Sequence, residues 1–402
     1  MKSATLKFNC RKFKCRPPLP SLSADDARRK VTELLTDHLQ LKIESYACDT
    51  QTVCDVLVKA SVEGKAIEGT CNDLDNVPTG HTVRACLNDQ FRPADLADIE
   101  QQVNAALTAD LPKRVWAKCR DMAVDLHDEP FYGKLPELLQ YACRGEAKAG
   151  TTYFYRVASV YIIDHGVPVT LAVTFVLPGD TLVAVLKRLL ARVRRLGLHW
   201  RCLLLDKGFC SIPVITYLQQ ARYSAILACP IRGKKGGTRA LCHGRASYLT
   251  THQFASATYG TRRAKVAVMR TFDTSRRRKA RRKLRWLVYV VINLDLRPDQ
   301  VHQRYRARFG IESSYRCMRD VHAMTTSRNA AVRFFLIALA FLLVNLWIIL
   351  RWRLCQIPRR GGRLIDEKRL ELQRLARFLA RAVEQVYGTI SVIYATAQPI
   401  NP

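Results

Sequence analysis

The feature that most constrains the fold is a strongly apolar run from Trp200 to Leu205 that ends in a charged residue, Asp206. A strand buried on both faces of a sheet has this pattern, because a half-exposed strand would alternate with polar residues. An ionised Asp at the end of such a strand is costly unless a cation meets it, and Gly208 lets the backbone turn sharply beyond it. We therefore predict that Asp206 is a metal ligand, with a helix N-cap as the alternative.

The apolar run belongs to an ordered series of elements. Hydrophobic periodicity predicts three strands, a helix, the apolar strand, a second helix and a further strand. Strands that alternate with helices in this way indicate an α/β domain. The predicted ranges are 118–127, 151–163, 168–176, 179–196, 200–206, 212–221 and 224–229.

The first predicted strand holds a second acidic candidate. Asp125 lies inside the apolar part of this strand, where a charge needs a metal ion or another cation to offset its burial. Asp128 lies three residues later and close to Pro130, a position that suits a turn residue. We favour Asp125 as the metal ligand and keep Asp128 as its rival.

A third acidic residue stands among cations in the stretch 305–319. We predict that this stretch is one helix. Its polar residues then fall on one stripe, which has two interpretations: a surface ion-pair ladder or a functional face. Viewed down the helix axis, four of its residues fall within an arc of roughly 60°. They are Tyr305, Arg308, Glu312 and Arg319, and Arg316 lies on the same stripe.

The spacing of these residues resembles the Y-x2-R-x3-E-x6-K signature of one branch of the DDE transposases of bacterial and archaeal insertion sequences. The motif from Asp206 to Phe209 and the position of Asp125 are similar to the other two acidic motifs of that family. The chain departs at Arg319, where the family usually has Lys; Arg keeps the charge but not the shape of the contact. The resemblance covers about residues 118–350.

The resemblance implies both a fold and a chemistry. The expected fold is α/β, a ribonuclease-H-like catalytic core with a β-rich insertion, preceded by a small all-α N-terminal domain. Asp125, Asp206 and Glu312 are then the catalytic carboxylates and metal ligands. Two-metal phosphoryl transfer needs carboxylates from separate elements, and Mg²⁺ favours such hard oxygen ligands. We expect two Mg²⁺ (or Mn²⁺) ions as cofactors.

The charge distribution points to a polyanionic partner. The formal net charge is +31, and residues 113–402 alone carry a net charge of +33. Residues 17–112, in contrast, carry a net charge of −8. Such an excess indicates a nucleic acid before a membrane, held mainly by the later part of the chain.

The candidate DNA-binding residues combine the resemblance with this charge. In the family, the Arg and Lys of the signature grip DNA at the transposon end. A basic run from Arg276 to Arg285 is a candidate phosphate track, with a solvated loop as the alternative. Trp286 follows it and either stacks on an unpaired base or packs in the core. The candidates are Tyr305, Arg308, Arg316, Arg319, Lys234, Lys235, Arg276, Arg277, Arg278, Lys279, Arg281 and Arg282.

The sequence of the N-terminal third predicts several helices, and Ser23 is the expected N-cap of the first one. A short helix bearing His81, Arg84 and Asn88 follows a polar turn and suggests a helix-turn-helix. The acidic balance of this region favours dimer contact or scaffolding instead, so both interpretations stay open. The predicted organisation is a basic tail (1–22), a helical domain (23–112), a catalytic domain (113–355) with an insertion at about 230–300, and a basic helical segment (356–402).

Two features bear on the compartment. The apolar run from Phe334 to Leu350 is at the short end for a membrane span, and we favour a core helix. None of the 14 cysteines is spaced as Cys-x2-Cys and no signal peptide is evident, so we expect reduced thiols. The expected location is cytoplasmic and associated with the nucleoid, without a membrane partner.

The leading functional prediction is a transposase that cleaves double-stranded DNA and transfers strands at the ends of its own insertion sequence. Synapsis of two ends implies a homodimer, by resemblance only. One alternative is a catalytically idle or domesticated DNA-binding protein, which the presence of all three carboxylates disfavours. The other is a ribonuclease-H-fold nuclease without strand transfer.

Overall fold

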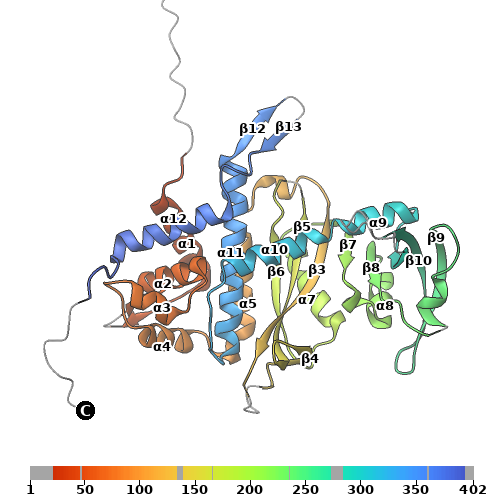
Figure 1. Ribbon diagram of the computed structural model, residues 1–402, viewed down its shortest axis with the longest axis horizontal. Coiled ribbons are helices and arrows are strands. Elements are labelled where there is room, and N and C mark those ends of the chain that lie inside the picture. The colour runs from red at the N-terminus through yellow and green to blue at the C-terminus, as the bar shows by residue number, and fades with distance from the viewer. Residues whose placement is uncertain are drawn as a thin grey trace, which may run out of the picture.

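The computed structural model describes residues 21–45, 48–133, 139–164, 166–234, 236–272, 284–359 and 362–393. A body of helices lies at one end of the long axis, and a large sheet covered by helices extends to the other end (Figure 1). The helices are α1 (Ala24–Leu39), α2 (Thr50–Glu63), α3 (Ile67–Asp73), α4 (Gly80–Gln90), α5 (Leu96–Thr108), α7 (Leu182–Arg195), α8 (Ile212–Gln220), α9 (Pro298–Arg306), α10 (Phe309–Asp320), α11 (Ala330–Leu354) and α12 (Leu372–Tyr387).

The central sheet has nine strands and contains every strand of the predicted series, and α7 and α8 are its two predicted helices. Its strands are β3 (Arg120–Phe131), β4 (Cys143–Lys148), β5 (Thr151–Ile163), β6 (Thr170–Val176), β7 (Trp200–Leu205), β8 (Ala225–Cys229), β9 (Tyr248–Ser256), β10 (Gly260–Phe272) and β11 (Leu284–Ile292). Two small hairpins lie outside it: β1 (Glu44–Ser45) with β2 (Cys48–Asp49), and β12 (Gln356–Arg359) with β13 (Gly362–Ile365).

The spatial order of the sheet is β4-β5-β3-β7-β8-β11-β10-β9, and β6 also pairs with β5. β5 runs antiparallel to both β3 and β6, whereas β7 runs parallel to both β3 and β8. Parallel neighbours need crossovers, and α8 supplies the one between β7 and β8. β11 joins the edge of β8 in antiparallel orientation, so the segment predicted as a β-rich insertion continues the same sheet.

β7 is buried on both faces, as its apolar pattern predicts. Cys202 and Leu204 belong to one hydrophobic cluster with Val301 and Tyr305 of α9. Leu203 and Leu205 face the opposite way into the main core, which includes apolar residues of α7 and α8. The strand is thus enclosed between two helical layers, and its carboxyl end emerges beneath α9.

The stretch predicted as one helix is two. α9 ends at Arg306 and α10 begins at Phe309, with a turn at Ala307 and Arg308 between them. α10 packs on β3 and β5, and α9 packs on β10 and β11, so each helix follows a different part of the sheet. The single helical stripe expected from sequence is therefore wrong for Tyr305, which belongs to α9.

α11 is the core helix favoured from sequence. It is long and apolar enough to cross a membrane, but 94% of its most apolar window is buried inside the protein. Its one interior amide, Asn345, is 2% exposed. The Asn345 side chain accepts a hydrogen bond from the backbone N–H of Thr170 and donates to the carbonyls of Thr170 and Leu107. These bonds tie α11 to both β6 and α5.

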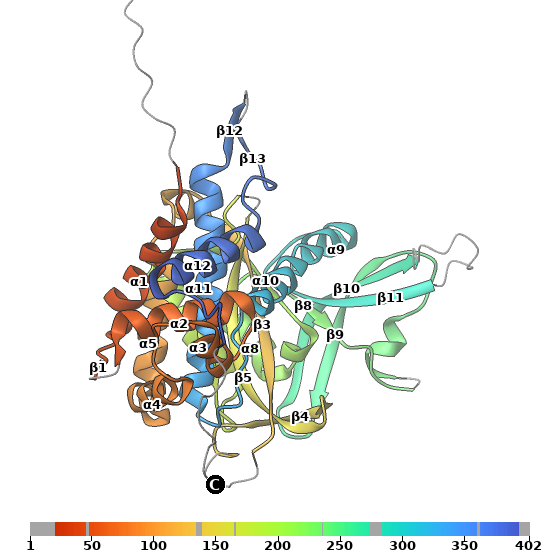
Figure 2. The same cartoon turned by 60° about the vertical axis from the view of Figure 1, so that its left-hand side comes forward.

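The N-terminal helices and the C-terminal helix form one packed body, in which α12 lies against α1 and α2 (Figures 1 and 2). Lys59 of α2 is 2% exposed and pairs with Glu384 of α12 at 2.6 Å. Tyr387 donates a hydrogen bond of 3.0 Å to Asp55, which also receives a bidentate contact from Arg28. Segments predicted as separate in sequence therefore share one core.

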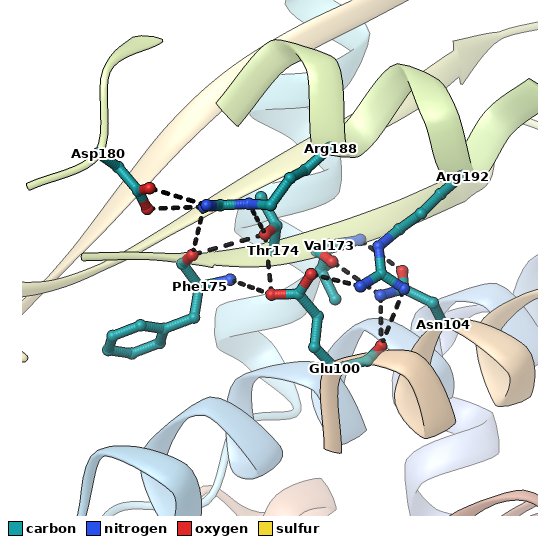
Figure 3. Close-up of polar contacts among 8 residues, drawn as sticks. All are labelled: Glu100, Asn104, Val173, Thr174, Phe175, Asp180, Arg188 and Arg192. Carbon is teal, nitrogen blue, oxygen red and sulfur yellow. Dashed lines mark hydrogen bonds and ion pairs between the residues drawn. The ribbon is translucent and has the colours of Figure 1, made fainter. Parts of the chain in front are cut away.

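A buried polar network fastens this body to the sheet (Figure 3). Glu100 of α5 accepts hydrogen bonds from the hydroxyl of Thr174 and the backbone N–H of Phe175, both on β6. Its other oxygen pairs with Arg192 of α7 at 2.5 Å. Asn104, one turn later, bonds both backbone groups of Val173. Three elements are thus locked together at the edge of the sheet.

The predicted helix-turn-helix region contains α3 and α4, and His81, Arg84 and Asn88 are exposed on α4. Arg84 pairs with Glu68 at 2.9 Å, and Asn88 accepts a hydrogen bond from Asn329 in the loop before α11. A DNA-reading role for α4 stays a prediction.

Candidate active site

Strand register brings two of the acidic candidates together. Val124 of β3 is the parallel partner of Leu205 of β7. Asp125 and Asp206 are the next residues on their chains, so their backbones lie side by side where β7 ends. Asp125 follows three fully buried residues, Met122 to Val124, and its side chain is 18% exposed.

α10 supplies the third carboxylate, and one guanidinium joins all three. The Nη1 atom of Arg308 lies 3.0 Å from Oδ2 of Asp125. Its Nη2 atom lies 2.5 Å from Oε1 of Glu312 and 3.6 Å from Oδ1 of Asp206. The acids predicted from β3, β7 and the signature stretch therefore converge around a single cation.

Arg308 is an internal residue here. It is 5% exposed, and its guanidinium lies 5.7 Å from the ring centroids of both Tyr305 and Phe309. Its Nε atom is buried and has no hydrogen-bond partner among the described residues. The contacts that hold the guanidinium are thus almost entirely ionic and aromatic.

Burial sets the electrostatics of the site. Burial raises the pKa of Asp125; the neighbouring charge of Asp206 adds to this, and Arg308 opposes it. A hydrogen bond from the backbone N–H of Leu126 to Oδ1 of Asp125 also favours the ionised form. Exposure of the side chains increases from 18% at Asp125 to 32% at Asp206 and 46% at Glu312, so the cluster opens towards solvent on the Glu312 side.

The three carboxylates are a suitable ligand set for a divalent cation. They supply hard oxygen donors from separate elements, which is the donor type that Mg²⁺ and Mn²⁺ prefer. In the described part of the chain, no three His, Cys, Asp or Glu side chains are drawn together tightly enough to hold one ion. The carboxylates surround a guanidinium instead, so the donor set fits a metal once that cation moves.

The other signature residues differ in exposure. Tyr305 is 6% exposed and donates a hydrogen bond of 3.3 Å to the carbonyl of Leu205, and its ring packs at a tilt against that of Tyr289. It therefore buttresses the end of β7 and reaches solvent only along the neighbouring cavity, which it lines; its DNA contact stays a prediction. Arg316 and Arg319 are exposed on α10, and neither pairs with an acid in the described part of the chain.

The rival acid has a different partner. Arg156 of β5 donates to both carboxylate oxygens of Asp128, at 2.6 and 3.0 Å. Because successive side chains of a strand alternate between faces, Asp128 points away from the face that carries Asp125. This ion pair accounts for the charge of Asp128 without a metal ion.

Several predicted DNA-binding cations cannot be placed. Lys234 is exposed in the loop after β8. The basic run connects β10 to β11, between Phe272 and Leu284, which are cross-strand partners. Outside the described residues lie Lys235, Arg276, Arg277, Arg278, Lys279, Arg281 and Arg282.

A cavity of about 560 Å³ opens beside the acidic cluster. Asp206 and Arg308 form part of its wall, and Trp286, Tyr289 and Phe309 give it aromatic surfaces. Of the further cations in its lining, Arg285 is the last residue of the predicted basic run, whereas sequence reasoning missed Lys207 and Arg306. Lys207 follows the predicted metal ligand and Arg306 lies inside the signature stretch, so proximity in sequence was the available signal.

Two comparisons with known proteins bear on this arrangement. A family model described as "Transposase DDE domain" matches residues 129–346, a range that holds Asp206 and Glu312 and begins four residues after Asp125. A solved structure of piggyBac transposase, a synaptic complex with hairpin DNA, is similar in fold with a TM-score of 0.53 and 11% identity. The similarity covers 90% of this chain and 78% of that chain. No curated protein matches the sequence.

Proposed function

The chain belongs to the family of DDE transposases and is therefore a DNA transposase, and from that premise we propose which of its residues carry the reaction. Asp125, Asp206 and Glu312 are the metal-ligating carboxylates. The observation that carries this assignment is their convergence, from β3, β7 and α10, within 3.6 Å of one guanidinium. Acids that gather around one cation in a folded chain are able to gather around another.

DDE transposases use divalent metal ions, and we propose two Mg²⁺ (or Mn²⁺) ions for this site. Bound there, the ions supply activation of the attacking oxygen and stabilisation of the leaving oxygen. The protein contributes position: β3 and β7 fix two carboxylates in register, and α10 brings the third over them. Tyr305 holds the end of β7 by its bond to the Leu205 carbonyl, which keeps Asp206 in place.

We propose that DNA lies along the open side of the cluster. Arg316 and Arg319 are exposed on α10 beside Glu312 and are free of ion pairs with the described residues, so they are available for phosphates. The cavity next to Asp206 combines aromatic walls with cations, a lining that suits an unpaired base and its phosphate. Core packing remains the alternative role for Trp286.

The finer features of the proposal come from the sequence. The signature spacing favours the insertion-sequence branch with the Y-x2-R-x3-E-x6-K motif and a ribonuclease-H-like core, with cleavage and strand transfer at the ends of the chain's own element. A homodimer would hold the two ends. The proposed location is the cytoplasm, on the nucleoid.

The decisive experiment measures Mg²⁺-dependent cleavage of a labelled duplex that carries the element's terminal sequence. Asp206→Asn and Glu312→Gln should each lower cleavage by at least about a thousandfold, because each removes a ligand whose charge the transition state needs. Binding of the same duplex should stay within a few-fold of wild type. Full cleavage by either folded variant would remove that residue from the proposed site.

The same assay separates the alternatives. Joining of the cleaved end to a target duplex distinguishes a transposase that transfers strands from a nuclease that only hydrolyses. Binding without cleavage by the wild-type chain, in either metal, would identify an idle DNA-binding protein.

A further inference from the structure

Arg308 occupies the place where a metal ion would be expected. Its guanidinium contacts carboxylates from three elements while 95% of the residue is out of solvent, so it acts as the counter-ion of the cluster in the free protein. Neutralising several buried acids with one internal cation lowers the cost of holding like charges together.

A divalent ion and this guanidinium cannot share the same oxygens. Mg²⁺ binds carboxylate oxygens at about 2.0–2.1 Å. The oxygens of Asp125 and Glu312 that would serve lie 3.0 and 2.5 Å from the two Nη atoms. A metal ion there would lie against a positive charge within van der Waals range, in a site where burial weakens screening. One cation must therefore leave before the other binds.

The position of Arg308 in the fold allows its side chain to move out of the acidic cluster. The residue lies in the turn that joins α9 to α10, where backbone hydrogen bonds run to the third preceding residue and the regular helical ladder is interrupted. Its buried Nε makes no hydrogen bond to any described residue. An outward rotation therefore breaks the contacts to the acids and changes those to the rings of Tyr305 and Phe309, which themselves line the neighbouring cavity. Phe309, which flanks it, is 52% exposed.

The cavity beside Arg308 is where its guanidinium would move. Arg308 already lines the cavity of about 560 Å³, together with Lys207, Arg285 and Arg306. The four cations outnumber the one carboxylate in the lining, Asp206, so the opening attracts anions. A DNA phosphate is the anion that a transposase brings to this position.

We propose that Arg308 is a placeholder cation that keeps metal ions out of the free enzyme and moves to a DNA phosphate when a duplex enters, which opens the carboxylates to metal. The proposal rests on the metal-ligating role proposed above for the three acids. It makes Arg308 a positioning residue that couples metal binding to DNA binding. By linkage, metal must strengthen DNA binding by the same factor by which DNA strengthens metal binding.

The test is calorimetric titration of the full-length protein with Mn²⁺ in the absence of DNA. Arg308→Met, which keeps bulk but removes charge, should bind Mn²⁺ about tenfold or more tightly than wild type, a factor within the usual range of coupling between sites. Arg308→Lys should bind like wild type, because a cation remains. Arg195→Met is the matched control, at an exposed arginine of α7 that pairs with no acid among the described residues, and should not change Mn²⁺ affinity.

A second arm needs no variant at this position. A short duplex at saturating concentration should raise the Mn²⁺ affinity of wild type by a similar factor, about tenfold, and that of Arg308→Met far less. If Arg308→Met fails to fold, as judged by its thermal melting, the DNA-dependence of the wild-type affinity still decides. Equal Mn²⁺ affinity of wild type with and without duplex, or unchanged or weaker binding by folded Arg308→Met, overturns the proposal.

The outcome is separable from that of the proposed function. If Asp206→Asn loses both Mn²⁺ binding and cleavage while Arg308→Met binds Mn²⁺ like wild type, the active-site assignment stands and the placeholder fails. If Asp206→Asn cleaves normally, the active-site assignment itself fails.

Discussion

At the residue scale, the site depends on which face of β3 an acid occupies. Asp125 and Asp128 are three residues apart, so their side chains point to opposite faces of the sheet. Asp125 meets Arg308 beneath α10, whereas Asp128 meets Arg156 on the neighbouring strand. Two similar residues on one strand thus have different chemistry available to them.

This difference gives a paired prediction. Asp128→Ala breaks a partly exposed ion pair and should cost about 1 kcal/mol of unfolding free energy or less, with cleavage near wild type. Asp125→Asn should keep the fold and lose cleavage. Urea denaturation and the end-cleavage assay on both variants check the result; loss of cleavage in folded Asp128→Ala would revive the rival assignment.

A second acid, Asp164, makes the stability of the protein depend on pH. Burial alone would raise the pKa of Asp164, but bonds from the backbone N–H of Gly166 and from Arg114 and Arg120 outweigh it and hold the pKa below 3.8. A carboxyl whose pKa is lowered on folding stabilises the protein above its unfolded pKa and loses that contribution as the pH falls through the folded value.

Asp164→Asn should therefore be less stable than wild type at neutral pH. The difference in unfolding free energy should shrink as the pH falls below 3.8, where the wild-type carboxyl also becomes neutral. Denaturant unfolding of both proteins across this range measures it. A difference that grows on acidification would contradict the assignment of the pKa shift.

At the element scale, the polar network of Figure 3 decides how the helical body sits on the sheet. Glu100 joins α5 to β6 and to α7, and Arg188 joins α7 to Asp180 and to the carbonyl of Phe175. These contacts lie at the edge strand β6, at a distance in sequence from the acidic cluster. β5 lies between β6 and β3, the strand of Asp125, so we assign the network a structural role.

Glu100→Gln should destabilise the protein by about 3 kcal/mol, because it removes one charge of a mostly buried pair and leaves Arg192 without its partner. The matched control is Glu146→Gln, at an exposed glutamate of β4 that makes no ion pair with the described residues. Urea denaturation compares them. An equal and small effect of both changes would show that the network contributes little.

At the scale of the whole molecule, the net charge of +31 implies that exposed cations form a surface for a polyanion. α12 provides part of one: Arg374, Arg377 and Arg381 are exposed at helical spacing and pair with no acid among the described residues. The opposite face of α12 is buried against α1 and α2. A fragment that begins at residue 113 would expose that face, so charge is better tested in the full chain.

The double variant Arg374→Gln, Arg381→Gln should bind random duplex DNA more weakly and lower the slope of log affinity against log salt by about 2, if both arginines contact phosphates. Lys42→Gln, Arg92→Gln removes the same charge from the acidic N-terminal region and should leave the slope nearly unchanged. Equal slopes for both double variants would mean that the α12 arginines form a solvated face.

The sequence by itself indicated the strands of the predicted series and named the acids that are candidates for the site. Local signals sufficed for these features: Ser23 is the N-cap of the first helix, as predicted, and the apolar pattern of β7 predicted a strand enclosed on both faces. An acid at the end of such a strand is conspicuous because burial of a charge is costly. Asp125 and Asp206 were therefore candidates from their place in apolar strands, and Glu312 became one through the signature spacing.

Only the tertiary structure decided how distant segments meet. The sequence stretch 305–319 has a helical pattern throughout, but packing on two parts of the sheet divides it at Ala307 and Arg308. That turn, together with the strand register, places the guanidinium among acids that lie 183 and 4 residues away in the chain. Long-range contacts of this kind, like that between Lys59 and Glu384, have no local signature, because they depend on the packing of whole elements.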